Sequence, residues 1–167
     1  MTKSLILVRH AESFIATPGT KDHERNLTNA GIRDACKIGK FLLNNHIIPE
    51  AIYSSHASRA ILTAQLISEQ ADLDPDRIIM KEDLYEASVR VLMKTIKEIE
   101  IRYRQVLIIG HNPALSFLCE YLTEKSIGRI VPAGICIIEF QFDSWYSIQK
   151  GTGTLKVLKS PAEIILS

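Results

Sequence analysis

The segment Ser4-Leu5-Ile6-Leu7-Val8-Arg9-His10-Ala11-Glu12-Ser13 contains four consecutive apolar residues and then changes abruptly to polar ones. An apolar run of this length is typical of a short strand that is buried on both faces of a sheet. Arg9 and His10 follow the run directly, so we expect both at the carboxyl end of the strand. Ligands of open α/β sheets bind at this edge, although an ordinary exit of the chain to solvent would show the same two residues. The rest of the chain distinguishes these alternatives.

The bulk composition excludes several classes of protein. The chain has 167 residues, of which 46% are apolar and 23% charged, and its formal net charge is +1. This length suits a single domain over residues 1–167. The balanced charge predicts no nucleic-acid partner, because such proteins carry a basic stripe. No apolar run is long enough for a signal sequence or a membrane span, so we expect a cytoplasmic protein with no membrane partner.

The cysteines and histidines do not suggest a metal site. Cys36, Cys119 and Cys136 lie far apart in the sequence and show no metal-ligand spacing among themselves or with the five histidines. Each lies in an apolar neighbourhood, so we expect all three to be reduced and buried. The first strand also lacks the glycine-rich turn of a nucleotide-binding fold. The sequence therefore predicts no cofactor and no metal.

Predicted strands and helices alternate along the chain. Apolar runs predict strands at 51–53, 78–80, 106–109, 135–142 and 154–158, and helical spacing predicts helices at 28–46, 57–69, 88–99 and from 113 onward. Residues 14–27 read as a surface loop. This alternation predicts an α/β fold, a three-layer α/β/α sandwich around a mostly parallel sheet. No helix is predicted between the last two strands, so this pair can also be antiparallel.

Polar residues from distant parts of the chain are expected at one edge of this sheet. His111 follows the strand at 106–109, as His10 follows the first strand, and Arg59 lies one turn into the helix after the strand at 51–53. Clustered cations repel one another unless an anion joins them, and guanidinium groups match the oxygens of phosphate. The pattern indicates a phosphate site in which one histidine attacks phosphorus and the other donates to a non-bridging oxygen.

Four blocks of the chain resemble, in order, the motifs of the histidine phosphatase (phosphoglycerate mutase-like) superfamily. The blocks are residues 7–13, 27–31, 53–64 and 110–113. The short chain and the segment Leu84-Tyr85-Glu86-Ala87 most resemble the SixA-type phosphohistidine phosphatases of that superfamily. The resemblance implies a phosphoglycerate mutase-like fold and a metal-independent phosphatase that forms a phosphohistidine intermediate.

The resemblance also implies roles for particular residues. His10 matches the phosphorylated nucleophile, and Arg9, Arg59 and His111 match the rest of the phosphate pocket. Arg25 matches an arginine that the SixA-like branch adds to this pocket, and the alternative for Arg25 is a solvated loop charge.

Two positions leave questions open. Glu86 is the best candidate for a general acid by its place after the third strand, but it also reads as an acid in the first turn of a helix, favoured by the helix dipole. Ala11 replaces the glycine of the superfamily signature, which matters only if this position requires a positive φ.

Three functions remain open at this stage. A phosphatase acting on phosphohistidine in a protein is the leading hypothesis, because only about fifty residues separate Arg59 from His111, too few to add a lid over a small substrate. The alternatives are a phosphatase of small phosphate esters with the same fold and a non-catalytic phosphate-binding module. The partner is thus a phosphorylated protein or a small phosphoester, and the sequence predicts no oligomeric state.

Overall fold

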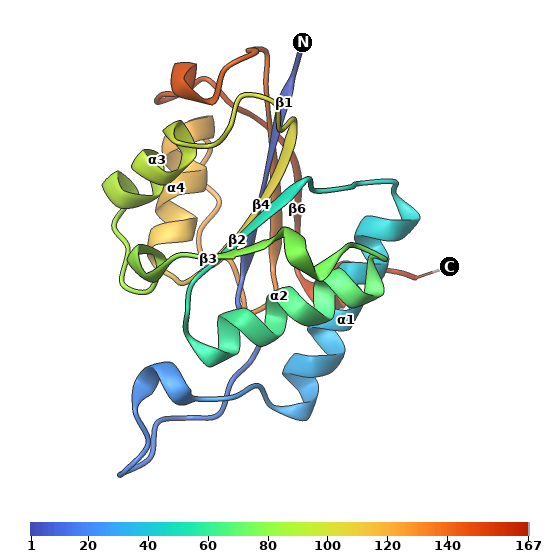
Figure 1. Ribbon diagram of the computed structural model, residues 1–167, viewed down its shortest axis with the longest axis vertical. Coiled ribbons are helices and arrows are strands. Elements are labelled where there is room, and N and C mark those ends of the chain that lie inside the picture. The colour runs from blue at the N-terminus through green and yellow to red at the C-terminus, as the bar shows by residue number, and fades with distance from the viewer. Residues whose placement is uncertain (167) are drawn as a thin grey trace.

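The computed structural model describes residues 1–166, and strands and helices alternate through this part of the chain (Figure 1). The elements in chain order are β1 Lys3–Arg9, α1 Asn29–Asn44, β2 Ala51–Ser54, α2 Ser58–Gln70, β3 Ile78–Met80, α3 Val89–Lys97, β4 Gln105–Gly110, α4 Ala114–Thr123, β5 Ile135–Phe140 and β6 Thr154–Lys159. Short 3-10 turns include η1 Asp22–Glu24, η3 Glu82–Leu84 and η4 Trp145–Ser147. Each α-helix within residues 1–166 is too short or too polar to span a bilayer.

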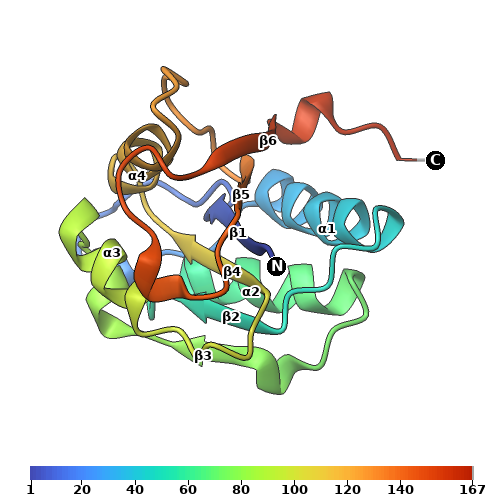
Figure 2. The same cartoon turned by 90° about the horizontal axis from the view of Figure 1, so that it is seen from above.

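All six strands form one sheet in the order β3-β2-β4-β1-β5-β6. The pairs β2–β3, β2–β4 and β1–β4 are parallel, whereas β5 pairs antiparallel with both β1 and β6. Helices α1 and α2 cover one face of the sheet, and α3 and α4 cover the other (Figure 2). The predicted three-layer α/β fold is confirmed, with an antiparallel final strand pair.

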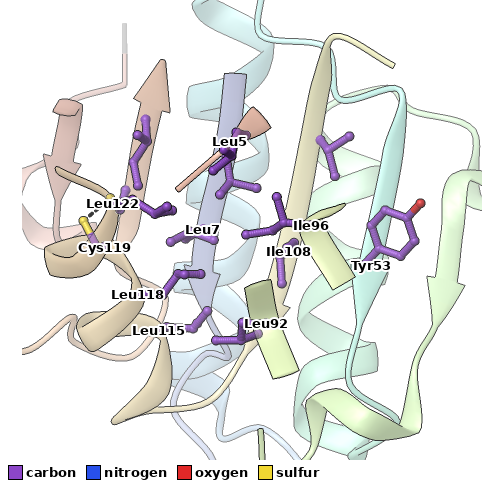
Figure 3. Packing of buried hydrophobic residues seen from close by; sticks show 14 of the residues in the cluster. Leu5, Leu7, Tyr53, Leu92, Ile96, Ile108, Leu115, Leu118, Cys119 and Leu122 are labelled. Atoms are coloured by element: carbon purple, nitrogen blue, oxygen red, sulfur yellow. Dashed lines mark hydrogen bonds between the residues drawn. The ribbon is translucent and has the colours of Figure 1, made fainter. Parts of the chain in front are cut away.

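The central position of β1 explains its uninterrupted apolar run. Successive side chains of a strand point to opposite faces of the sheet. Leu5 and Leu7 accordingly pack into the core beneath α3 and α4, which Figure 3 shows, while Ile6 and Val8 pack into the core beneath α1 and α2. All four side chains are 0% exposed, as expected for a strand between two helical layers.

Hydroxyl caps fix the starts of two helices. Thr28 accepts a hydrogen bond from the backbone N–H of Gly31 at the start of α1, and Ser88 accepts one from Val91 at the start of α3. The predicted boundaries are otherwise within a few residues of those observed. Strand β5 ends at Phe140, two residues before its predicted end, and Pro113 precedes α4 instead of lying in its first turn.

The three cysteines are free thiols, but they are not all buried. Cys119 and Cys136 are 0% exposed, and their Sγ atoms lie 2.8 Å apart between α4 and β5. Cys36 is only partly buried, so the prediction of full burial was wrong for this residue. The reason is helical geometry, because Ala35 and Ile38 point to the core and Cys36 lies at the border of that face.

Candidate active site

The register of the parallel strands brings the polar ends of β1, β4 and β2 together. Arg9 is paired with Gly110, so His10 and His111 follow equivalent positions on adjacent strands. The backbone N–H of His10 donates to the carbonyl of Gly110, and that of Ser55 donates to Ile109. The two histidine rings consequently lie with their centroids 5.1 Å apart.

The surroundings of His10 favour a neutral imidazole with its proton on one particular ring nitrogen. Its side chain is buried, and its Nδ1 lies 2.8 Å from the carbonyl oxygen of Ala11, which can only accept. The proton is therefore assigned to Nδ1, leaving the lone pair on Nε2, to which Arg59 Nε–H approaches at 3.4 Å. Burial lowers the pKa of His10 to about 4, with a further contribution from nearby arginines. Near neutral pH, the His10 imidazole is thus uncharged and carries a lone pair on Nε2.

His111 is positioned by Ser55. Its Nε2 lies 2.8 Å from the hydroxyl of Ser55, which also accepts a hydrogen bond from the backbone N–H of Ala57. If Ser55 donates its own proton to Nε2, the proton of the neutral His111 ring is on Nδ1 and is available to the pocket. Burial lowers the pKa of His111 to about 3, and proximity to His10 adds to the effect.

Arg9 and Arg59 bring positive charge into the pocket. Arg59 is 5% exposed, and Arg9 donates from one terminal nitrogen to the carbonyl of Ile130 at 3.1 Å. The Nε of Arg9 is buried without a hydrogen-bond partner among residues 1–166. Burial lowers the pKa of Arg9, and the neighbouring Arg129 and Arg59 lower it further. A buried guanidinium nitrogen without a partner, next to a second guanidinium group, favours an anionic ligand.

Asp22 enters the same pocket from η1 and was not identified from the sequence. Its carboxylate accepts from Arg59 at 3.0 Å and from Arg25 at 2.8 Å, and the Tyr85 hydroxyl donates to it as well. The hydrogen bond from Tyr85 and the two arginines hold the pKa of Asp22 well below its usual range. Arg25 is therefore part of the pocket and is not a solvated loop charge. The sequence offers one indication of this role: Asp22 lies three residues before Arg25, a spacing at which the two side chains can form an ion pair.

Tyr85 and Glu86 also line the pocket. The Tyr85 ring lies edge-on to His111 with 5.5 Å between centroids, and the Arg59 guanidinium is 5.9 Å from the same ring. Glu86 is exposed at the rim. It precedes the Ser88 cap of α3, so the alternative of an acid in the first helical turn is wrong.

The segment that follows β1 is fixed by the blocks at 27–31 and 53–64. A methyl group at Gly31 would lie 2.1 Å from the carbonyl oxygen of Glu12, so only glycine allows α1 to approach this closely. The backbone N–H of Ala11 donates to the Thr63 hydroxyl at 3.0 Å. Ala11 is not among the residues with positive φ, and alanine in place of the signature glycine is therefore tolerated.

These side chains surround an open cavity of about 420 Å³. Its lining includes all six residues expected from the sequence, namely Arg9, His10, Arg25, Arg59, Glu86 and His111, together with Asp22 and Tyr85. No group of three potential metal-ligating side chains occurs within residues 1–166. Three guanidinium groups and two carboxyl groups line the cavity beside two neutral histidines, and this excess of positive charge suits a phosphoryl group next to an imidazole nitrogen. The arrangement defines a site for phosphoryl transfer.

Comparison with known proteins assigns the family. Residues 5–93 match the histidine phosphatase superfamily (branch 1). The uncharacterized protein Rv1276c of Mycobacterium tuberculosis H37Rv is 32% identical over 158 residues, which cover 89% of this chain and 96% of that protein. A chloroplastic protein of Arabidopsis thaliana is 35% identical over 72 residues, and the match spans only 33% of its length. The chain belongs to the histidine phosphatase superfamily.

Solved structures of SixA share the fold. A protein from Nakamurella multipartitia assigned as the phosphohistidine phosphatase SixA has a TM-score of 0.83 at 20% identity, with 96% of this chain and 97% of that chain covered. The protein histidine phosphatase SixA in complex with tungstate has a TM-score of 0.82 at 19% identity, with 97% and 99% covered. This likeness establishes a fold of the phosphoglycerate mutase-like, SixA type.

Proposed function

We propose that this protein is a phosphatase that removes the phosphoryl group from phosphohistidine in another protein, through an intermediate at His10. Membership of the superfamily supports phosphatase chemistry in general. The finer proposal rests on the two carboxyl groups that line the pocket. Asp22 is kept ionised by Tyr85 and two arginines, and Glu86 is exposed at the rim. Neither is a buried acid of the kind that protonates an alkoxide leaving group.

A phosphohistidine substrate does not require such an acid. The imidazole that leaves when its P–N bond breaks has a conjugate acid with a pKa of about 6.5, so the protonated ring is already a good leaving group. An alkyl phosphate must expel a far stronger base, and a general acid accelerates that step by about 10²- to 10⁴-fold. The charge state of the pocket therefore suits cleavage of a P–N bond.

In the proposed first step, His10 Nε2 attacks phosphorus. The P–Nε2 bond forms as the P–N bond of the substrate breaks, and the substrate ring leaves as neutral imidazole with the proton it already carried. N–H groups of Arg9 and Arg59 stabilise the charge on the phosphoryl oxygens, and His111 Nδ1–H donates to one of them. Water then attacks phosphorus, the P–Nε2 bond breaks, and both protons of the water leave with dihydrogen phosphate.

The chain around the pocket supports a protein substrate. Between Arg59 and His111 the chain consists of α2, β3, α3, β4 and their short connections. This stretch contains no inserted segment that could enclose a small molecule. The cavity is open to solvent, and Glu86 and Ala87 are among the residues that line it. A histidine on the surface of a folded partner could therefore reach His10.

One observation favours a second candidate, a phosphatase of small phosphate esters. Glu86 lines the rim of the cavity, from which a protonated carboxyl group could reach the oxygen of a leaving alcohol. A comparison of two substrates separates the two functions. The ratio of kcat/KM is measured for a peptide that carries one phosphohistidine and for the same peptide with phosphoserine at that position, with His10→Ala as the inactive control.

We expect the phosphohistidine peptide to be favoured by about 100-fold or more, since only the serine peptide needs a general acid. Equal efficiency on the two peptides would instead identify an ester phosphatase. Binding of phosphate without turnover of either peptide would indicate a non-catalytic binding module.

A further inference from the structure

A second and larger hollow lies on the surface formed by α3, α4 and η4. It has a volume of about 640 Å³, and its apolar lining includes Val89, Met93, Tyr121 and Tyr146. Both tyrosines are exposed, Tyr121 by 38% and Tyr146 by 74%. The two helices lie side by side over the same face of the sheet in both views (Figures 1 and 2). We call this hollow the α3–α4 groove.

The α3–α4 groove is bordered by positive charge. Arg90, Lys94 and Lys97 line it, are all exposed, and follow one another at helical spacing along one side of α3. None of the three forms an ion pair within the part of the chain that the structure describes, and Glu98 is the only acidic residue in the lining of the groove. The Lys97 ammonium lies 5.3 Å from the centre of the Tyr146 ring. Such a surface is complementary to one that combines acidic and apolar side chains.

The groove and the phosphate pocket both border α4, at different points along the helix. Ala114 lines the phosphate pocket, Tyr121 lines the groove, and Phe117 lies between them with 56% of its surface exposed. Seven helical residues span about 10 Å. A standard protein–protein interface covers about 800 Å² on each partner, which corresponds to a patch of roughly 16 Å in radius. A protein whose phosphohistidine enters the pocket would therefore also cover the groove.

We propose that the α3–α4 groove docks the phosphoprotein substrate through an acidic surface with apolar side chains that lies roughly 10–15 Å from its phosphohistidine. This inference rests on the proposed function, because it assumes that the phosphoryl group is presented by a protein. Docking there lowers KM and accelerates association, and the chemistry of the transferred phosphoryl group is unaffected.

The test uses three probes and two matched pairs of charge reversals. The probes are a phosphohistidine peptide with a Glu- and Leu-rich flank, the same peptide with Lys in place of Glu, and free phosphohistidine. Lys94→Glu with Lys97→Glu alters the groove, whereas Arg33→Glu with Lys40→Glu makes the same change on exposed residues of α1, on the other face of the sheet. All four positions are on the surface, so both double variants should fold.

For the groove variant we expect kcat/KM on the acidic peptide to fall about tenfold or more, because four units of charge are changed at the docking surface. Turnover of free phosphohistidine should stay unchanged in both variants, and the α1 variant should process the acidic peptide normally. Raising the salt concentration should weaken the preference of the wild type for the acidic peptide. Equal losses in the two variants, or no preference between the two peptides, would overturn the docking proposal.

A direct binding measurement separates this proposal from the proposed function. Fluorescence anisotropy of the unphosphorylated acidic peptide needs no catalysis and should show weaker binding to the groove variant than to the α1 variant. If no phosphohistidine probe is hydrolysed but this difference in binding persists, the proposed activity fails and the docking surface stands. Equal binding to both variants would refute the groove as a docking site, whatever the activity.

Discussion

The protonation state of His10 can be tested through protein stability. The His10 side chain is 8% exposed and its pKa is lowered from 6.5 to about 4 by burial and nearby arginines. Between pH 4 and 6.5 the unfolded chain therefore binds a proton at this residue that the folded protein does not bind. Stability rises with pH across this window and is lost as pH falls. At pH 5 the loss from His10, relative to pH 7.5, is about 2 kcal/mol.

The measurement is urea unfolding of the wild type and of His10→Gln at pH 7.5 and pH 5. Trp145 is the single tryptophan of the chain and is 1% exposed, so its fluorescence reports unfolding. His10→Gln should lose about 2 kcal/mol less than the wild type on acidification, because glutamine does not titrate. His46→Gln, the same substitution at an exposed position, controls for the change of residue. An identical pH dependence in the wild type and His10→Gln would refute a neutral His10 in the folded protein.

Three further predictions concern the other residues of the pocket. Arg59→Lys should lower kcat by about 10²-fold, since an ammonium group cannot reproduce the guanidinium contacts to the phosphoryl oxygens, and a loss below threefold in steady-state assays would contradict this role. Asp22→Asn should strengthen competitive inhibition by inorganic phosphate about tenfold, because it removes a negative charge beside Arg25 and Arg59. Weaker inhibition would show that Asp22 instead positions these arginines for phosphate. Glu86→Gln should barely change turnover of a phosphohistidine substrate but lower turnover of an alkyl ester by about 10²-fold or more, and equal losses on both would rule out a general acid that serves the ester alone.

Most of the fold follows from local patterns in the sequence. The apolar run of β1 and the helical spacing after Thr28 and Ser88 depend on residues close together in the chain, and the predicted strand and the two predicted helix starts are confirmed. The partial exposure of Cys36 was missed because an apolar sequence neighbourhood does not specify on which side of the core-facing stripe a helical residue lies.

The site residues that follow strands could be predicted from the sequence, whereas those that enter the pocket from irregular segments could not. Parallel strands that end at one edge bring His10 and His111 together, so their proximity follows from the predicted sheet. Asp22 and Tyr85 reach the pocket from segments without strand or helix periodicity. Hydrogen bonds from Arg59 hold Asp22 there, and the Tyr85 hydroxyl donates in turn to the Asp22 carboxylate. Such contacts between distant loops leave little trace in the sequence.

The most direct test of the account is detection of the phosphorylated enzyme. The protein is mixed with a phosphohistidine peptide, stopped in base within milliseconds to seconds, and examined by ³¹P NMR and by mass spectrometry of proteolytic fragments. We predict one phosphoramidate on His10 that is stable in base and labile in acid, and that forms and decays fast enough to account for turnover. His10→Ala should lack this intermediate and lose activity by several powers of ten. Near-normal turnover by His10→Ala, or rapid turnover of the wild type without this intermediate, would contradict the account.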